Sequence, residues 1–193
     1  GRMLTAATMM GSTLKGKDDS ITVKINGGGP CGTVLAVSDS DGNVRGCIGK
    51  ADISLPLNKK GKLDVAGAVG KNGFVTVIKD LGLREPYIGK TPIVSGEIAE
   101  DITSYYAVSE QIPTVCALGV LTEHDSGEII CAGGFMIQLL PTADDTIIER
   151  VEESIKDLPP VTKMLSDGMS PEEICKKALS KFNLQLLDET NTA

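Results

Sequence analysis

Residues 104–121 read SYYAVSEQIPTVCALGVL and join a helical pattern to an apolar, extended one. Upstream, residues 97–111 begin with acidic side chains, which suit the positive end of a helix dipole, and carry apolar residues at helical spacing. Downstream, residues 114–123 are apolar at successive positions, as in a strand of a sheet that is covered on both faces. Pro113 separates the two patterns because it has no N–H with which to continue a helix. The stretch therefore predicts a central helix that leads into a strand in the middle of a covered sheet.

The polar residues at this junction, Ser109–Thr114, have the groups of a small active site. A nucleophile would need an adjacent base, and the only histidine, His124, lies beyond the next strand in a predicted turn. The nucleophile-elbow motif G-x-S-x-G is absent. We therefore favour a helix end whose polar side chains satisfy the last free carbonyls, and we expect no catalytic residue.

Hydrophobic alternation and turn residues outline the elements on both sides of this junction. A helical stripe opens the chain, and a short helix of one or two turns is expected within residues 62–70. Gly133 and Gly134 interrupt the last strand and suggest a bulge or a close approach of another backbone. The other strands are expected within residues 21–25, on either side of the Asp41–Gly42 turn, and within 74–80, 86–96 and 128–141. The pattern predicts an α+β fold, a mixed β-sheet core packed with helices and followed by a small helical segment.

The end of the chain has a different character, and we place a boundary between a core at residues 1–142 and a helical linker region at 143–193. A capping box of Thr146 and Glu149 is expected to start the first linker helix. A short helix follows at residues 161–167, and Ser170 with Glu173 forms a second capping box. The apolar stripe of the first linker helix consists of Ile147, Val151, Ile155 and Leu158.

Composition limits the classes of function. The chain has 193 residues, of which 41% are hydrophobic and 3% aromatic, so it can form a sizeable aliphatic core. Its net charge of −7 argues against a surface that binds nucleic acid. No apolar run reaches the ~18–20 residues that a membrane span needs. We therefore expect a soluble, cytoplasmic protein with neither nucleic acid nor membrane as a partner.

The five cysteines are scattered and form no C-x-x-C or C-x-C pair, so a metal site made by this chain alone is not expected. Cys116 and Cys131 lie on predicted neighbouring strands and could meet, but we favour reduced, buried thiols. The loop Gly27–Pro30 could hold an anion through its backbone N–H groups, yet it lacks the lysine and hydroxyl residue of a phosphate loop. A structural turn is the favoured interpretation, and a small-molecule-binding domain or enzyme using this loop is the alternative.

Four phrases in order are more specific than any single motif: LTAATMMGSTLKG with ITVKINGGGP, then VGKNGFVTVIKDLGLREPYIG, VSGEIAEDITSYYAVSEQIPT and AGGFMIQLLP. In this order they resemble the heat shock protein 33 family, the redox-regulated holdase chaperones. The resemblance runs from residue 1 to about residue 185. It implies a core of β-sheets packed with helices, a helical linker, and a C-terminal zinc domain with a C-x-C and C-x-x-C switch.

The chain departs from the family pattern at both ends. Family members begin earlier, so we expect this chain to be truncated at its N-terminus, and we expect the zinc domain to be absent from it. None of its cysteines matches a switch cysteine, so we expect no cofactor here. Zinc is expected only in the full-length protein.

The resemblance implies an ATP-independent chaperone that binds unfolding proteins under oxidative or heat stress. Oxidation would release zinc as disulfide bonds form, loosen the linker and open an apolar surface to unfolded client proteins. The stripe Ile147, Val151, Ile155 and Leu158 would cover the core when the linker is docked, whereas the client-binding residues are unknown. Family members dimerise, so a homodimer is expected, and a plain oligomerisation module is a third interpretation.

Overall fold

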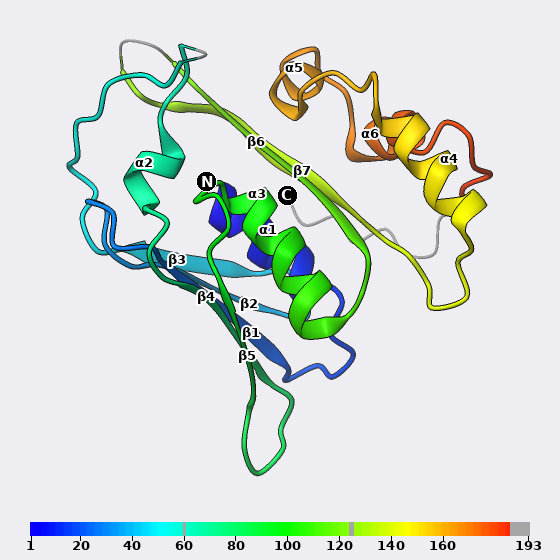
Figure 1. The fold of residues 1–193 in the computed structure, drawn as a ribbon, viewed down its shortest axis with the longest axis horizontal. Helices are drawn as coiled ribbons and strands as arrows, with labels where there is room; N and C mark the ends of the chain where they lie inside the picture. The colour runs from blue at the N-terminus through cyan, green and yellow to red at the C-terminus, as the bar shows by residue number, and fades with distance from the viewer. Residues whose placement is uncertain (60, 124–125, 186–193) are drawn as a thin grey trace.

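The computed structural model describes residues 1–59, 61–123 and 126–185, and it arranges them in layers. A five-stranded sheet forms one side, two helices lie on it, and a long two-stranded ribbon crosses over those helices (Figure 1). A second group of helices lies on the far side of the ribbon. The expected α+β class, a sheet core packed with helices and followed by a helical segment, is confirmed.

The five-stranded sheet is antiparallel throughout and has the order β3-β2-β1-β4-β5. Its central strand alternates as the sequence predicts, with Ile21, Val23 and Ile25 buried and the residues between them half-buried or exposed. Gly42 has the positive φ of 83° at the predicted hairpin turn between β2 and β3. The strands are β1 (Ser20–Asn26), β2 (Val34–Asp39), β3 (Val44–Ile48), β4 (Phe74–Asp80) and β5 (Tyr87–Pro92).

Helices α1 (Arg2–Gly11) and α3 (Ile98–Tyr105) cover the inner face of this sheet. Helix α1 buries Met3 and Met10 of the predicted stripe. Asp101 is buried in the first turn of α3, where its Oδ1 accepts from the backbone N–H groups of Val94 (2.8 Å) and Ser95 (3.1 Å) and fixes the turn after β5. The short helix α2 (Val65–Val69) ends at Gly70, as predicted.

The predicted central helix continues beyond α3 as a π-helical turn, η1 (Tyr106–Glu110). Gln111 then adopts a left-handed conformation with φ of 57°, and its N–H donates to the carbonyl of Tyr106. Pro113 follows, and β6 (Thr114–Thr122) begins directly after it. The predicted junction between helix and strand is therefore confirmed.

The ribbon formed by β6 and β7 (Ile129–Gln138) is a separate antiparallel sheet of two strands. Residues 114–123 do not lie in the middle of a larger sheet, so that part of the prediction is wrong. The physical basis of the prediction holds, because helices cover both faces of the ribbon. At Gly133 the close neighbour is the Leu165 side chain and not the expected backbone, and the register irregularity lies between Leu121 and Thr122.

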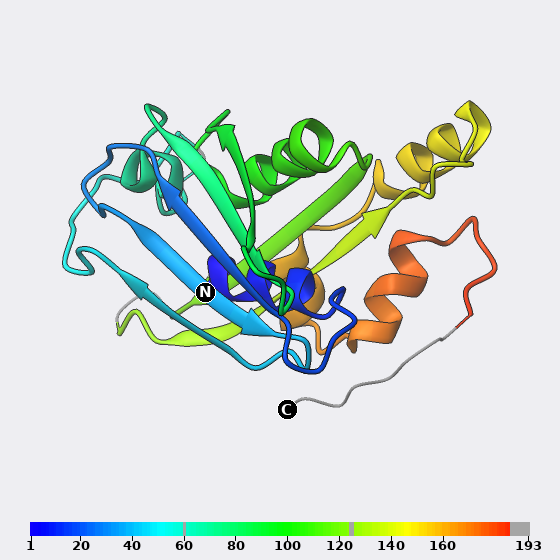
Figure 2. The ribbon, with the colours of Figure 1, turned by 90° about the horizontal axis from the view of Figure 1, so that it is seen from below.

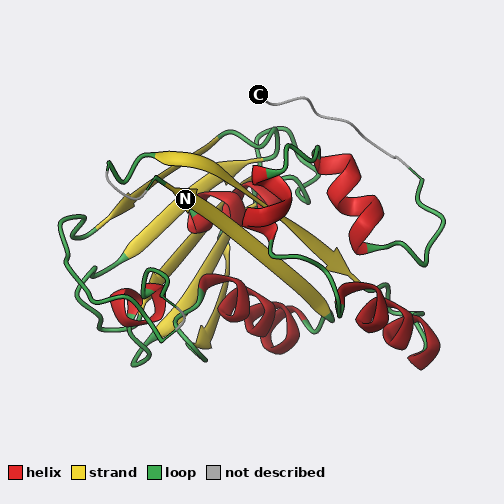
Figure 3. Cartoon of the chain, turned by 90° about the horizontal axis from the view of Figure 1, so that it is seen from above, coloured by secondary structure: helices red, strands yellow, loops and turns green. Residues whose placement is uncertain are grey.

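The helical segment after the ribbon contains α4 (Asp145–Ile155), α5 (Val161–Ser166) and α6 (Pro171–Ala178). Asp144, and not the expected pair of Thr146 and Glu149, caps α4, because its carboxylate accepts from the N–H of Ile147. The predicted capping box at the start of α6 is confirmed. Figure 3 shows α5 over the ribbon, and α4 and α6 towards one end of the molecule.

Candidate functional site

The two faces of the β6–β7 ribbon pack against different parts of the molecule. Side chains alternate along each strand, so Cys116, Leu118 and Met136 point into the main core with α1 and α3. The residues between them point the opposite way, towards α5 and α6. We call this second surface the covered face; its described members are Val115, Ala117, Phe135 and Ile137.

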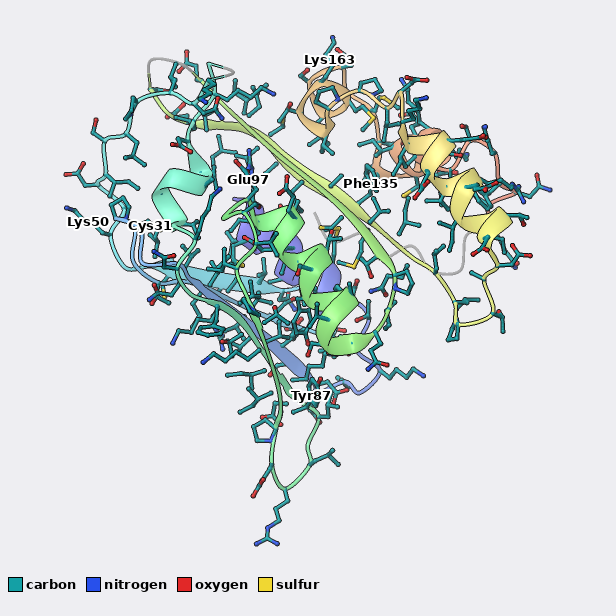
Figure 4. The ribbon with its side chains drawn as sticks, viewed as in Figure 1. Cys31, Lys50, Tyr87, Glu97, Phe135 and Lys163 are labelled. Atoms are coloured by element: carbon teal, nitrogen blue, oxygen red, sulfur yellow. The ribbon has the colours of Figure 1, made fainter. Side chains whose placement is uncertain are left out.

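The helical segment supplies the lid of the covered face. Phe135, which Figure 4 labels on the ribbon, is buried in one hydrophobic cluster with Val161 and Met164 of α5. Ile174 and Ala178 of α6 complete a second, smaller hydrophobic cluster. The ribbon is thus shared by two cores, of which only the larger one involves the five-stranded sheet.

The four predicted docking residues differ in how deeply they are buried. Val151 is buried, and Leu158 is half-buried and packs against the second cluster. Ile147 and Ile155 are half-buried. Val151 also lines an apolar cavity of about 150 Å³ between α4 and the end of the ribbon. Their role as a docking surface stays a prediction, as does the domain boundary, which falls in the connection between β7 and α4.

The outer face of the five-stranded sheet carries apolar side chains among charged and polar ones such as Lys24, Arg45 and Lys90. Opposite the core, the strands present Phe74, 46% exposed, and Ile88, 60% exposed, beside half-buried residues of β2 and β4. Lys90 lies over the Phe74 ring, with Nζ 4.0 Å from its centroid. Figure 2 gives a view of the molecule in which the strands of this sheet can be followed from end to end. We define the outer face by Leu35, Val37, Cys47, Phe74, Ile78 and Ile88.

The polar residues of the junction form a structural network. Glu110 accepts from the Tyr105 hydroxyl and from Lys79 Nζ, which lies 2.8 Å away. Ser109 lies 3.4 Å from the hydroxyl of Tyr87. The expectation that the polar side chains satisfy free carbonyls at the helix end holds for Thr114, whose hydroxyl donates to the carbonyl of Ile112 at 2.9 Å. It is wrong for Ser109 and Glu110, which contact side chains from β4, β5 and α3 instead. Burial and the neighbouring Glu110 carboxylate both raise the pKa of Tyr105, which keeps its hydroxyl a donor.

The Gly27–Pro30 loop is occupied by the protein's own backbone. The N–H of Gly29 donates to the carbonyl of Val69 at 2.9 Å, and the N–H of Gly28 donates to Asn26 Oδ1 at 3.0 Å. A Cβ on Gly27 would lie 2.1 Å from the carbonyl oxygen of Gly70. The loop is packed against the end of α2 and offers no free amide cradle at these two positions.

The cysteines do not meet. Cys116 pairs in register with Met136, and Cys131 pairs with Leu121, so the predicted neighbours lie apart on opposite faces of the ribbon. Burial raises the pKa of Cys116 to about 12, which favours the thiol over the thiolate that binds metals. Among the described residues, no group of three or more metal-ligating side chains comes together. The chain's cysteines thus do not fit a zinc site; His124 lies outside the described residues.

The sequence predicted cover on both faces of residues 114–123, because apolar residues stand at successive positions. It did not indicate that α5 and α6 supply the cover on one of these faces. Within the part of the chain that the structure describes, no helix has the length and apolar character to cross a membrane.

Comparison with known proteins agrees with the resemblance seen in the sequence. A family model described as Hsp33 protein matches residues 1–193. The chain is 50% identical over 188 residues to a 33 kDa chaperonin of Geobacillus sp. (strain WCH70), covering 97% of this chain and 63% of that protein. It is 52% identical over 188 residues to a 33 kDa chaperonin of Clostridioides difficile (strain 630), covering 97% of this chain and 64% of that protein.

The fold is similar to the crystal structure of a 33 kDa chaperonin, a heat shock protein 33 homolog, from Thermotoga maritima. The TM-score is 0.86 at 40% identity, and the match covers 93% of this chain and 60% of that one. The chain therefore spans less than two thirds of the length of these relatives.

Proposed function

The chain belongs to the Hsp33 family, and from this membership we propose that it is an ATP-independent holdase that binds unfolding proteins through apolar surface. Its chaperonin-named relatives support a chaperone function. Binding of this kind needs no catalytic residue, and the junction at Ser109–Thr114 is used in packing. The proposal therefore includes that the chain is not an enzyme.

The observation that carries the proposal is the covered face under a small helical lid. Burial of apolar surface is worth about 25 cal/mol per Å², so a surface that holds Phe135 and Ile137 would also favour apolar segments of an unfolded client. The lid has few buried side chains, which is typical of an element that opens at low free-energy cost. The outer face adds apolar area that is accessible without any opening.

The zinc-dependent redox switch that the resemblance implies is a separate part of the proposal. Because the cysteines of this chain do not fit a zinc site, the switch would have to act through residues outside it. In this chain such a switch could act only by changing how firmly α4–α6 rest on the ribbon. Activity in the cytoplasm under oxidative or heat stress, and a homodimeric state, belong to the same proposal.

Analytical size-exclusion chromatography tests binding directly. A chemically unfolded protein is diluted into buffer without nucleotide, with or without the folded chain, and the soluble fraction is separated. We expect the client to elute together with the chain, and the native form of the same client to elute alone. Elution of the chain at its own position at every client ratio would contradict the proposal. The position of the free chain reports its oligomeric state.

A further inference from the structure

Helix α5 approaches the ribbon backbone at one point. Gly119 and Gly133 face each other in the register of β6 and β7. A Cβ on Gly119 would lie 2.8 Å from the backbone nitrogen of Thr162 and 3.0 Å from Cβ of Val161. A Cβ on Gly133 would lie 3.0 Å from Cδ1 of Leu165. Helix α5 thus occupies the space that side chains on these two residues would take.

The backbone itself does not require glycine at either position. Neither Gly119 nor Gly133 is among the residues with positive φ. Glycine weakens a strand relative to β-branched residues, so two glycines that face each other lower the stability of the ribbon. The close approach of α5 is the feature of the structure that accounts for both glycines.

The rest of the contact between the helical segment and the ribbon is less dense. Helix α4 buries Val151 alone among its residues, above the cavity of about 150 Å³. The cluster around Phe135 is much smaller than the main core. A cavity lined by apolar side chains forfeits packing energy, so the segment depends strongly on α5 to remain in place.

From these contacts we propose that Gly119 and Gly133 form a seat for α5, and that this seat governs the release of α4–α6 from the covered face. While α5 is seated, Phe135 is 6% exposed. When α5 leaves, Phe135 and its neighbours on the ribbon become accessible. The consequence for client binding rests on the proposed function, whereas the seat itself does not.

The two glycines are expected to differ in a way that tests the seat. Gly119→Ala meets a backbone nitrogen, which moves only if α5 moves. Gly133→Ala meets the end of a leucine side chain, which can rotate away. Measured by hydrogen exchange and mass spectrometry, amides in residues 161–178 should exchange about ten-fold faster in Gly119→Ala, with a smaller increase in Gly133→Ala. Fluorescence of a dye that binds exposed apolar surface should also rise, more in Gly119→Ala than in Gly133→Ala.

Two further variants separate the seat from ordinary effects on the strand. Ala132→Val adds bulk to an exposed residue of β7 that points away from α5, and it should leave exchange in residues 161–178 unchanged. Leu165→Ala removes the side chain over Gly133 and should loosen α5 without altering the ribbon. In that background Gly133→Ala should have no additional effect, because its methyl group enters the space left by Leu165.

Unchanged exchange in residues 161–178 of Gly119→Ala, with β1 protected as in the parent chain, would overturn the seat. If Gly119→Ala does not fold, the test becomes a comparison of Leu165→Ala with the double variant that also carries Gly133→Ala. Additive increases in the exchange of residues 161–178 would then overturn the seat. Faster exchange without any gain in client binding would support the seat and contradict client binding at the covered face. Client binding by the parent chain, with no variant loosening α5, would contradict the seat alone.

Discussion

At the scale of single residues, Glu110 joins the end of the central helix to a strand that lies 31 residues earlier in the sequence. It ends the π-helical turn and accepts from Tyr105 of α3 and Lys79 of β4. Its side chain is 15% exposed and that of Lys79 is 19% exposed, so the pair is only weakly screened by water. Lys79 also lies near the Tyr87 ring, 5.4 Å from its centroid. The network fixes the β4–β5 hairpin to the end of the central helix.

Replacing Glu110→Gln should therefore destabilise the chain by about 1–3 kcal/mol, because Lys79 loses its anionic partner in a largely buried site. Urea unfolding should show a lower midpoint with an unchanged m-value. Glu85→Gln, in the exposed loop between β4 and β5, is the matched control and should have no measurable effect. Equal midpoints for the two variants would show that the network does not stabilise the fold.

Sequence reasoning identified this cluster of polar residues but not its use. Pro113 and the change of pattern around it were enough to predict the end of the helix. The partners of Glu110 come from strands 31 residues earlier and from the preceding turn of helix, and nothing local indicates that contact. Pairings of this kind depend on tertiary structure, so they could not be predicted from the sequence.

At the scale of elements, α6 was the most predictable because its signals are local. Ser170 Oγ accepts from the N–H of Glu173, and the Glu173 carboxylate accepts from the N–H of Ser170 at 2.7 Å. The hydrogen bond from the Ser170 N–H, followed by the Ser170 side chain, holds the pKa of the Glu173 carboxyl below its ordinary value of 4.5. The ribbon was less predictable: its apolar character indicated cover on both faces, but not that β6 and β7 pair only with each other.

Replacing Ser170→Ala should lower the stability of α6 by about 1 kcal/mol, as is typical for loss of an N-cap. Ser180→Ala, at an exposed position after the helix, is the control. The pKa of Glu173 is lowered in the folded state. The stabilisation from its carboxylate, which accepts from the Ser170 N–H, is therefore fully present above pH 4.5 and is lost as the pH falls through the lowered pKa. Hydrogen exchange across residues 171–178 should show the difference between Glu173→Gln and the parent chain shrink in acid, because Ser170→Ala keeps the backbone N–H that the carboxylate accepts from. A difference that is constant with pH would contradict the role of the Glu173 carboxylate.

At the scale of the whole molecule, the ribbon separates a large core from a small one. The larger core lies between the five-stranded sheet, α1 and α3, and the smaller one lies between the ribbon, α5 and α6. Composition and periodicity predicted the α+β class and the helical end of the chain. They could not predict that a single pair of strands would carry both cores, because that depends on how distant elements pack.

The division gives the molecule one firmly packed part and one part suited to opening. In the proposed holdase function, the first part would keep its fold while the second uncovers apolar surface. We propose that this chain, without nucleotide, keeps unfolding proteins from aggregating.

Light scattering of a chemically unfolded client, diluted into buffer that contains the folded chain, tests this claim most directly. We predict that scattering falls progressively as the chain is raised from equimolar to several-fold excess over the client, with no effect of added ATP. An inert protein of similar size and charge, at the same concentrations, should leave scattering unchanged. Scattering that stays at the control level at several-fold excess of the folded chain would contradict the account.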